Sequence, residues 1–485
     1  MKIVVAGGGT AGWLAAYVLC KSQPKQHVIT VVESSKIGII GAGEGSTGLL
    51  VQLINGHFFE SGTDAETFLN KVDGTNKLGI KHTNWTGDGS SYFAPLDGSI
   101  TGHLISDFVF QYGLAELKKE ELYKTSEIGQ AYYNSSSPKI EAFHFDGHKV
   151  GQYLKELCIK DGVNHIDSEI MDVNIDDMES IISINLSNDS SIKGDFFIDC
   201  TGFSRLLSKK LNINWVSYKK HLPVDTAMPF LLDYTKEEKF IIPQTEATAL
   251  SSGWMWNIPL KTRRGCGYVF DSFYISREEA QKEVEEFLGK KIKPIKFIEF
   301  ESGRSEVFWK NNCLSLGLAA AFAEPLEATS IHTTIVQLLT FSNEFLSTSK
   351  EKTINKNNQD SYNFKIAKLY DLTLDFLVVH YQGGRTDSEF WKNISTGATL
   401  TDRTRGVVER AKTRILGVLE FEGIFGTPYG PLWNWILSGI NLITAEQAMS
   451  QLKEQNLYKI AKEKYNNFEK EYYEYVKVFP KWDSK

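Results

Sequence analysis

The chain has 485 residues and a formal net charge of −7, and hydrophobic residues make up 42% of it. This length allows about three domains' worth of material, while scattered basic residues give no surface suited to DNA or RNA, so we expect no nucleic-acid partner. No apolar run reaches the ~18 residues of a membrane span, so we expect no membrane contact. The first residues do not have the pattern of a secretory signal, and the five cysteines lack Cys-x-x-Cys spacing. We therefore expect a cytoplasmic protein with reduced thiols.

The amino-terminal residues have the pattern of a strand, a glycine turn and a helix. Residues 3–6 are apolar and run into Gly7, Gly9 and Gly12, which have Gly-x-Gly-x-x-Gly spacing. Gly7 permits the turn, Gly9 lets backbone amides approach a pyrophosphate, and Gly12 allows the helix to pack closely on the strand. Thr10 and Ala11 stand at the amino end of the helix, where free N–H groups and the helix dipole favour phosphate.

A second strand is expected at residues 28–32 and ends at Glu33. This carboxylate can accept a ribose hydroxyl, and it argues against a 2′-phosphate. The chain shows one such unit and no second glycine fingerprint for a nicotinamide donor, which favours FAD over NAD. If the protein uses reduced flavin, a separate NAD(P)H-dependent flavin reductase has to supply it.

Further along the chain, the patterns indicate mixed α and β structure. Glycines at 38–45 predict a backbone loop close to a ligand, and residues 196–203 predict a buried strand that returns to the nucleotide site. Residues 225–300 alternate as in an antiparallel layer, and the chain from Glu327 onward reads as mostly helical. We therefore predict an interleaved body over 1–345 and a helical cap over 346–485.

The sequence Trp254-x-Trp256-x-Ile258-Pro259 is unusual, because tryptophan occurs only ten times in the chain. Taken alone, such a stretch is more often an edge of the hydrophobic core. It gains weight because it follows a predicted dinucleotide-binding unit.

In their order along the chain, these motifs resemble the flavin-dependent tryptophan halogenase family, over most of the sequence. The resemblance rests on the glycine turn, the 41–47 loop, the Trp-x-Trp-x-Ile-Pro element and residues 324–332, Glu-Pro-Leu-Glu-Ala-Thr-Ser-Ile-His. It implies an α/β (α+β) flavin-monooxygenase fold of Rossmann type, with an antiparallel substrate sheet and a helical carboxy-terminal region.

The same resemblance assigns roles to individual residues. Lys77 takes the place of the family's catalytic lysine and Glu327 that of its catalytic glutamate. The backbone amides of Thr329 and Ser330 would receive halide, and Trp254 and Trp256 would form a barrier between flavin and substrate. Glu44, Leu318 and Ile331 match flavin-contacting positions, and no metal is implied.

The implied reaction uses FADH2, O2 and a halide (chloride, bromide or iodide) to make hypohalous acid, which Lys77 would pass to an electron-rich arene while Glu327 accepts the proton that the arene loses. Taken singly, a lysine at a strand start is most often a solvated surface residue. Lys81, four residues further along the chain, is the alternative if the alignment to the family is shifted.

Two departures from the family pattern and two alternatives remain. Ala328 and Ser330 replace a common serine and glycine, and Ala94 and Leu96 stand where tryptophan-specific members carry a His and a Phe that clamp the indole. We therefore expect a small aromatic substrate of the indole or phenol type, with free tryptophan not favoured. An FAD-dependent aromatic hydroxylase and a catalytically silent flavin-fold protein are the alternatives, and the oligomeric state stays open.

Overall fold

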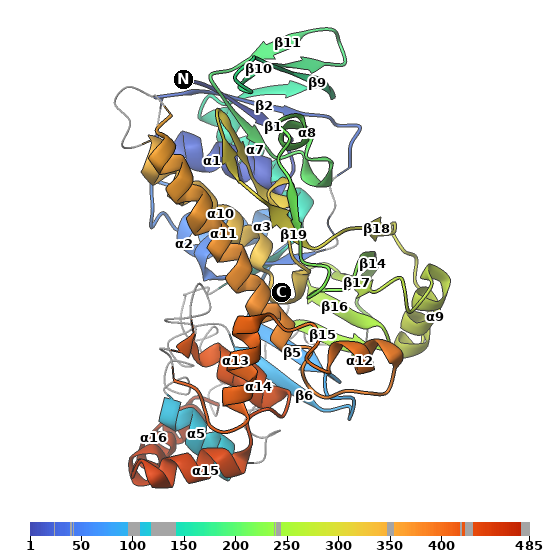
Figure 1. The fold of residues 1–485 in the computed structure, drawn as a ribbon, viewed down its shortest axis with the longest axis vertical. Coiled ribbons are helices and arrows are strands. Elements are labelled where there is room, and N and C mark those ends of the chain that lie inside the picture. The colour runs from blue at the N-terminus through green and yellow to red at the C-terminus, as the bar shows by residue number, and fades with distance from the viewer. Residues whose placement is uncertain are drawn as a thin grey trace. The chain divides into compact units, whose positions relative to one another are not determined.

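The first strand of the chain lies inside a six-stranded sheet in the computed structural model (Figure 1). The sheet pairs its strands in parallel except at one edge, where the outermost pair is antiparallel. In spatial order, its strands are β20 (Trp309–Lys310), β21 (Cys313–Ser315), β12 (Phe196–Asp199), β1 (Lys2–Ala6), β2 (Val28–Glu33) and β8 (Asn164–Asp167). The strands β1 and β12 are nearly continuous apolar runs, as parallel strands covered on both faces require.

The structure describes residues 1–476 with several gaps. The residues outside the description are 24, 39–40, 42, 96–106, 118–141, 237, 239–243, 347–353, 418–419, 422–429 and 477–485.

This sheet belongs to a first compact unit, which is assembled from residues 1–74, 145–219 and 300–371. Helices α1 (Thr10–Ser22) and α7 (Gly147–Lys160) lie side by side next to β1, and α1 is buried along residues 12–19 (Figure 1). An antiparallel sheet of β9 (Ile170–Ile175), β10 (Ile181–Leu186) and β11 (Ser191–Lys193) shares an apolar core with β1 and β12.

Shorter elements complete the first unit. They are β3 (Glu44–Gly45), α2 (Gly48–Ile54), α3 (Ala65–Lys71), α8 (Leu206–Lys210), β13 (Trp215–Ser217), β19 (Gly303–Ser305), the 3-10 turn η2 (Gly317–Ala319), β22 (Ala321–Phe322), the 3-10 turn η3 (Pro325–Glu327) and α10 (Thr329–Phe341).

The second unit contains residues 75–144, 220–299 and 372–485 and is built on a seven-stranded sheet. Neighbouring strands are antiparallel except for one parallel pair, β15 and β5. In spatial order the strands are β18 (Ile298–Glu299), β14 (Thr226–Leu232), β17 (Arg264–Phe270), β16 (Gly253–Pro259), β15 (Thr245–Leu250), β5 (Gly79–Thr83) and β6 (Ser91–Pro95).

The two faces of this sheet are used differently. Helix α9 (Arg277–Leu288), which begins with a Ser276–Glu279 capping box, packs its buried Ala280 and Val284 with Met255 of β16 in a hydrophobic cluster. Side chains alternate along a strand, so Trp254 and Trp256 are directed to the face opposite Met255. The sequence period therefore places both tryptophans away from the α9 core.

The remaining described elements of the second unit are β4 (Thr75–Asn76), which pairs with the start of β7 (Phe143–Phe145), and a set of helices. The helices are α5 (Asp107–Glu116), α12 (Glu389–Ile394), α13 (Asp402–Ala411), α14 (Gly430–Gly439), α15 (Ala445–Glu454) and α16 (Tyr458–Val476), while α11 (Lys356–Val379) contributes to both units.

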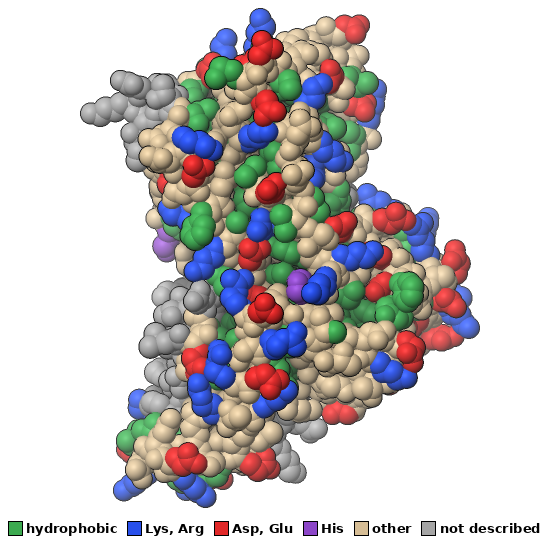
Figure 2. All heavy atoms as spheres, viewed as in Figure 1, with side chains coloured by type: hydrophobic (Ala, Val, Ile, Leu, Met, Phe, Trp, Pro, Cys, Tyr) green, Lys and Arg blue, Asp and Glu red, His purple; other side chains and the backbone are tan. Residues whose placement is uncertain are grey.

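These elements confirm the predicted mixed α/β fold with a Rossmann-type parallel sheet, an antiparallel sheet and a helical carboxy-terminal region. The division at residue 345 stays a prediction, and the two compact units have other boundaries. Figure 2 shows Lys and Arg side chains mixed with Asp and Glu over the displayed face. Within the described part of the chain, no helix combines the length and apolarity needed to cross a bilayer.

Candidate active site

The glycine turn between β1 and α1 leaves room for a ligand only at its middle glycine. Gly7 has a φ of 105°, and a Cβ there would lie 2.2 Å from the carbonyl oxygen of Cys200, while a Cβ at Gly12 would lie 1.9 Å from that of Gly7. At Gly9, by contrast, an added Cβ meets nothing within 4 Å. No side chain caps α1, so its first N–H groups face this open space. The turn therefore fits the pyrophosphate of FAD.

Glu33, at the end of β2, lies directly over this turn. A Cβ at Gly8 would be 1.8 Å from its Oε2, and the Trp13 indole donates a hydrogen bond to the same oxygen over 3.2 Å. The Lys155 ammonium lies 2.7 Å and the His165 imidazole 2.9 Å from Oε1. These contacts fix the Glu33 carboxylate beside the glycine turn, and its role as ribose acceptor stays a prediction.

Glu44 lies close to the start of α1 and α7. A Cβ at Gly147 would be 2.1 Å from its Oε1, and the Thr10 hydroxyl donates to the Gly147 carbonyl over 3.1 Å. Burial, with a smaller contribution from the Asp146 charge, raises the pKa of Glu44 to about 7. The sequence motif did not reveal this titration near neutrality.

The segment from η2 to α10 carries the other predicted residues of the first unit. Leu318 lies in η2, whose Gly317 is packed against Ala11 so closely that a Cβ would lie 2.6 Å away. Ala328, with a φ of 54°, turns the chain from η3 into α10, and Thr329 and Ser330 form the first turn of that helix. Thr329 and Ile331 are buried, Ser330 is exposed, and Glu327 is half-buried.

His332 connects this helix with the loop before α2. Its Nδ1 lies 2.7 Å from the Thr47 hydroxyl, and burial lowers its pKa to about 4. The imidazole is therefore neutral at neutral pH and fixes α10 against the loop that ends the 41–47 motif. The sequence contained His332 within the matched motif but gave it no role.

Lys77 lies in the second unit, in the turn between β4 and β5, and is only 1% exposed. Its backbone N–H donates to the Ala142 carbonyl over 2.9 Å. The solvated-surface interpretation of this lysine is therefore wrong, whereas Lys81 is half-buried on β5. Glu327 belongs to the other compact unit.

A chain of hydrogen bonds lies next to Lys77 and is centred on His144, which sequence analysis did not select. The Thr75 hydroxyl donates its proton to the Pro259 carbonyl over 2.7 Å. The hydroxyl oxygen of Thr75 therefore accepts a hydrogen bond from Nδ1 of His144 at 3.2 Å. Nε2 then accepts from the Thr245 hydroxyl at 2.8 Å. Burial and the Lys77 charge hold the pKa of His144 well below its usual range, so the imidazole is neutral.

The two tryptophans of the motif lie on β16, with ring centroids 6.3 Å apart. Trp254 is buried, and Trp256 lies over Gly267 of β17, where a Cβ would be 2.1 Å from the indole. Trp85 is the next ring, 6.5 Å from Trp254. Ala94 is buried at the end of β6, and Leu96 lies outside the described residues.

The parallel sheet, the glycine turn and the acid at the end of β2 together define a dinucleotide-binding enzyme fold, and the open space at Gly9 suits a flavin nucleotide. The sequence profile of the tryptophan halogenase family matches residues 2–456. The chain belongs to the tryptophan halogenase family and is an enzyme of the flavin-dependent halogenase class.

Individual relatives agree with this assignment. Tryptophan 6-halogenase SttH of Streptomyces toxytricini is 32% identical over 453 residues, 85% of this chain and 84% of that protein. The 7-chloro-L-tryptophan 6-halogenase KtzR of Kutzneria sp. (strain 744) is 32% identical over 433 residues, 81% of this chain and 82% of that protein. The crystal structure of SttH has a TM-score of 0.84 at 28% identity and covers 99% of this chain and 98% of its own.

Proposed function

We propose that this enzyme uses FADH2, O2 and a halide to make hypohalous acid, and that Lys77 directs the oxidised halogen to a small electron-rich arene of the indole or phenol type. The observation that carries the proposal is the burial of Lys77, because a lysine at a strand start is otherwise a surface residue. Reduced flavin would come from a separate NAD(P)H-dependent reductase.

The first unit supplies the features that suit the flavin and the halide. Gly7, Gly9 and Gly12 leave the amide groups at the start of α1 open, and Glu33 lies where a ribose hydroxyl would be accepted. When bound, the reduced flavin supplies the electrons for the reaction with O2. The amides of Thr329 and Ser330, at the uncapped start of α10, would hold the halide without a charged side chain.

The second unit supplies control over the product. The Lys77 side chain can hydrogen-bond to hypohalous acid or capture it as a haloamine, so that the oxidised halogen does not diffuse freely. The rings of Trp254 and Trp256 act as the barrier that keeps oxygen chemistry away from the arene. Glu327 accepts the proton that the arene loses after it has gained the halogen.

We expect Lys77→Ala to lose halogenated product while flavin oxidation continues, because the oxidant would still form but would no longer be directed. The assay supplies purified protein with FAD, a flavin reductase, NADH and each halide in turn, together with a panel of indoles and phenols. Mass spectrometry identifies the products, and a hypohalite trap measures oxidant released to solution.

Lys81→Ala is the matched control, since Lys81 lies four residues further along the same segment and is half-buried. It should retain halogenation. Retained halogenation in Lys77→Ala would remove Lys77 from the mechanism. A hydroxylated product formed without halide would favour the aromatic hydroxylase instead.

A further inference from the structure

Aromatic side chains of the second unit form a continuous series of ring contacts that begins at the Trp-x-Trp pair. We call this series the aromatic chain, and it consists of Trp256, Trp254, Trp85, Tyr381, Trp391, Phe390, Tyr274 and Phe273. Tryptophan and tyrosine are the side chains that lose a single electron most easily. A series of them in contact can therefore pass an electron vacancy from one ring to the next.

The inner half of the aromatic chain is buried. Trp254 lies 6.3 Å from Trp256 and 6.5 Å from Trp85, measured between ring centroids, and Trp85 and Trp254 are each 1% exposed. From Trp85, the next rings are Tyr381 at 5.3 Å and Trp391 at 5.8 Å. The distances from Trp85 to Tyr381 and Trp391 are shorter than those from Trp254 to Trp256 and Trp85. The electron vacancy can therefore move from the motif to Tyr381 or Trp391 through rings that are in contact.

The outer half reaches the surface. Phe390 lies 6.4 Å from Tyr381, 5.3 Å from Trp391 and 5.7 Å from Tyr274. Phenylalanine is not oxidised as tryptophan and tyrosine are, so an electron from Tyr274 crosses the Phe390 ring in one longer step to reach Tyr381 or Trp391. Tyr274 is half-buried and touches Phe273, which is 84% exposed. The Asn393 amide donates to the Tyr274 oxygen over 2.7 Å, so the phenol proton is left for solvent.

Hydrogen bonds to the indoles favour movement away from the motif. Among the described residues, the buried N–H of Trp254 has no acceptor. Trp85, by contrast, donates to the Ala247 carbonyl over 2.9 Å and Trp391 to the Leu250 carbonyl over 2.7 Å. A carbonyl dipole directed at an indole stabilises positive charge on that ring, so the vacancy is more stable on Trp85 than on Trp254.

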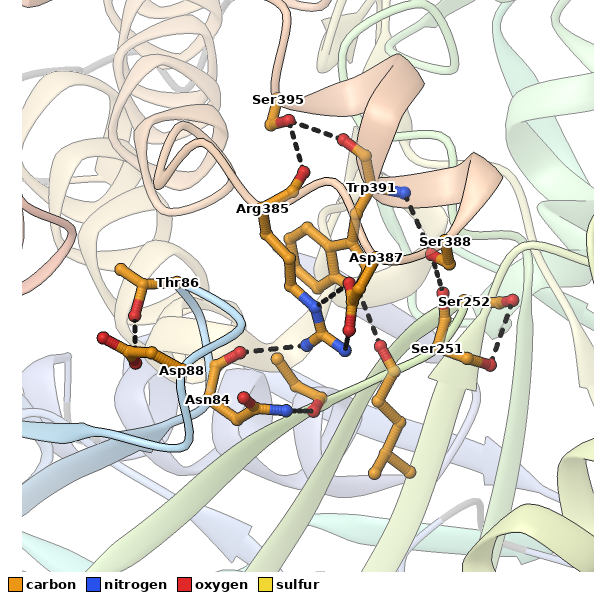
Figure 3. Close-up of polar contacts among 12 residues, drawn as sticks. Asn84, Thr86, Asp88, Ser251, Ser252, Arg385, Asp387, Ser388, Trp391 and Ser395 are labelled. Carbon is orange, nitrogen blue, oxygen red and sulfur yellow. Dashed lines mark hydrogen bonds and ion pairs between the residues drawn. The ribbon is translucent and has the colours of Figure 1, made fainter.

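Arg385 opposes accumulation of charge on Trp391. Its guanidinium lies 4.8 Å from the Trp391 ring centroid and is held by Asp387 through bonds of 2.6 and 2.9 Å, as Figure 3 shows. A cation over the ring disfavours a second positive charge there. Tyr274 is favoured instead, because it can release its phenol proton to solvent when it loses an electron and so stays neutral.

We propose that the aromatic chain carries electron vacancies from Trp254 and Trp256 to the surface at Tyr274 and so protects the active site from one-electron oxidants. The proposal rests on the proposed function, which places the oxidant beside this tryptophan pair. A halogen atom, formed when hypohalous acid splits homolytically into halogen atom and hydroxyl radical, takes one electron from Trp254 and becomes halide. Trp85 and Tyr381 refill the vacancy in turn, and Tyr274 finally loses one electron and one proton. A soluble thiol restores Tyr274 by giving back a hydrogen atom.

Light provides a test that needs neither halide nor O2. Excited oxidised FAD takes one electron from an indole, and in the proposed function the motif tryptophans form the barrier next to the flavin. A light pulse applied to the holoenzyme under argon would then introduce the vacancy at the motif. Transient absorption should show a tryptophan radical followed by a tyrosyl radical. We expect Tyr274→Phe and Tyr381→Phe to lose the long-lived tyrosyl signal, since each removes only a hydroxyl group.

Two controls separate this proposal from the proposed function. Tyr234→Phe, at a half-buried tyrosine outside the aromatic chain, should keep the full tyrosyl signal. Lys77→Ala should also keep it, even though halogenation is lost. An unchanged tyrosyl signal in both chain variants, or no tryptophan radical in the wild type, would overturn the proposal.

The protective role has its own readout during turnover without an arene. Tyr274→Phe should begin at the wild-type rate of flavin oxidation but lose activity in fewer turnovers, with oxidised Trp254 and Trp256 found by peptide mass spectrometry. Equal lifetimes and equal tryptophan oxidation in the two proteins would rule out protection by this route.

Discussion

The imidazole of His144 connects two parts of the second unit that the proposed chemistry needs together. Through Thr75 it reaches the turn that carries Lys77 and the Pro259 carbonyl at the end of the Trp-x-Trp-x-Ile-Pro element. Burial and the Lys77 charge depress the pKa of His144, so its imidazole is neutral. It donates one hydrogen bond, to Thr75, and accepts one, from Thr245. We therefore propose that His144 positions Lys77 and does not act as an acid at neutral pH.

We expect His144→Phe to reduce halogenated product and to raise free hypohalite, with flavin oxidation unchanged. The variant leaves the buried Thr245 hydroxyl without the acceptor it has in His144 and removes one hydrogen bond from the half-buried Thr75 hydroxyl. This costs about 1–3 kcal/mol of stability and loosens the Lys77 turn. Product yield and hypohalite release are measured together at a temperature well below unfolding.

His148→Phe, at an exposed position on α7, is the control, and His144→Gln should recover part of the yield because an amide both donates and accepts. If His144→Phe delivered the halogen as efficiently as wild type, the imidazole would have only a structural role.

Glu44 predicts a pH dependence of stability in the first unit. Its pKa rises from an ordinary 4.5 to about 7 on folding. Its stabilising contribution is therefore complete below about pH 4.5 and is lost as the pH rises through 7. Glu44→Gln lacks this titration, so between pH 4 and 8 the variant should gain up to about 3 kcal/mol relative to wild type.

Urea unfolding of both proteins across this pH range measures the difference, and Glu60→Gln at an exposed position is the control. Parallel stability curves for wild type and Glu44→Gln would contradict the raised pKa of Glu44.

At the scale of elements, the pairing of β16 with β17 decides where the Trp256 ring lies. Trp256 is directly opposite Gly267, and the missing side chain there gives the indole its space. A glycine inside a strand otherwise weakens the strand, so close approach of the indole explains its position.

Gly267→Ala should displace Trp256, since the new Cβ would lie 2.1 Å from two ring atoms. We expect a stability loss of about 1–3 kcal/mol, a shift in tryptophan fluorescence and more hypohalite released per flavin oxidised. Adding Trp256→Leu should recover stability in Gly267→Ala but not the retention of hypohalite. Additive effects of the two substitutions on stability would show that residues 256 and 267 do not interact.

Sequence reasoning predicted the elements whose signals are local. The glycine spacing after an apolar strand located β1, the turn and α1, and the alternation over 225–300 predicted the antiparallel layer to which β14, β16 and β17 belong. It could not find His144, because Thr75 and Thr245 are 69 and 101 residues away from it in the chain. The burial of Lys77 depends on contacts of the same long-range kind.

At the scale of the whole molecule, the predicted flavin-contacting residues all belong to the first unit, while Lys77 and both motif tryptophans belong to the second. These residues come from distant parts of the chain, among them Gly9, Glu44 and Leu318. Flavin binding should therefore affect two segments of the sequence at once, 1–74 and 300–371.

We expect FAD to slow amide hydrogen exchange mainly in peptides from 1–74 and 300–371. At a hundredfold excess over its Kd, the ligand should add about 2.7 kcal/mol to the opening free energy of these segments. Exchange followed by mass spectrometry makes the measurement, with Gly9→Val as a variant whose side chain would occupy the space left for the pyrophosphate. Protection confined to 220–299 would contradict this placement of the cofactor.

Each unit is made of three separate segments, so the polypeptide passes from one unit to the other at five places, after residues 74, 144, 219, 299 and 371. An engineer who wished to replace the second unit with that of a relative would have to make five splices, not one. A chimera made with a single crossover would contain parts of both units from each parent. Changes of substrate preference are therefore reached more readily by replacing individual side chains than by exchanging blocks of gene.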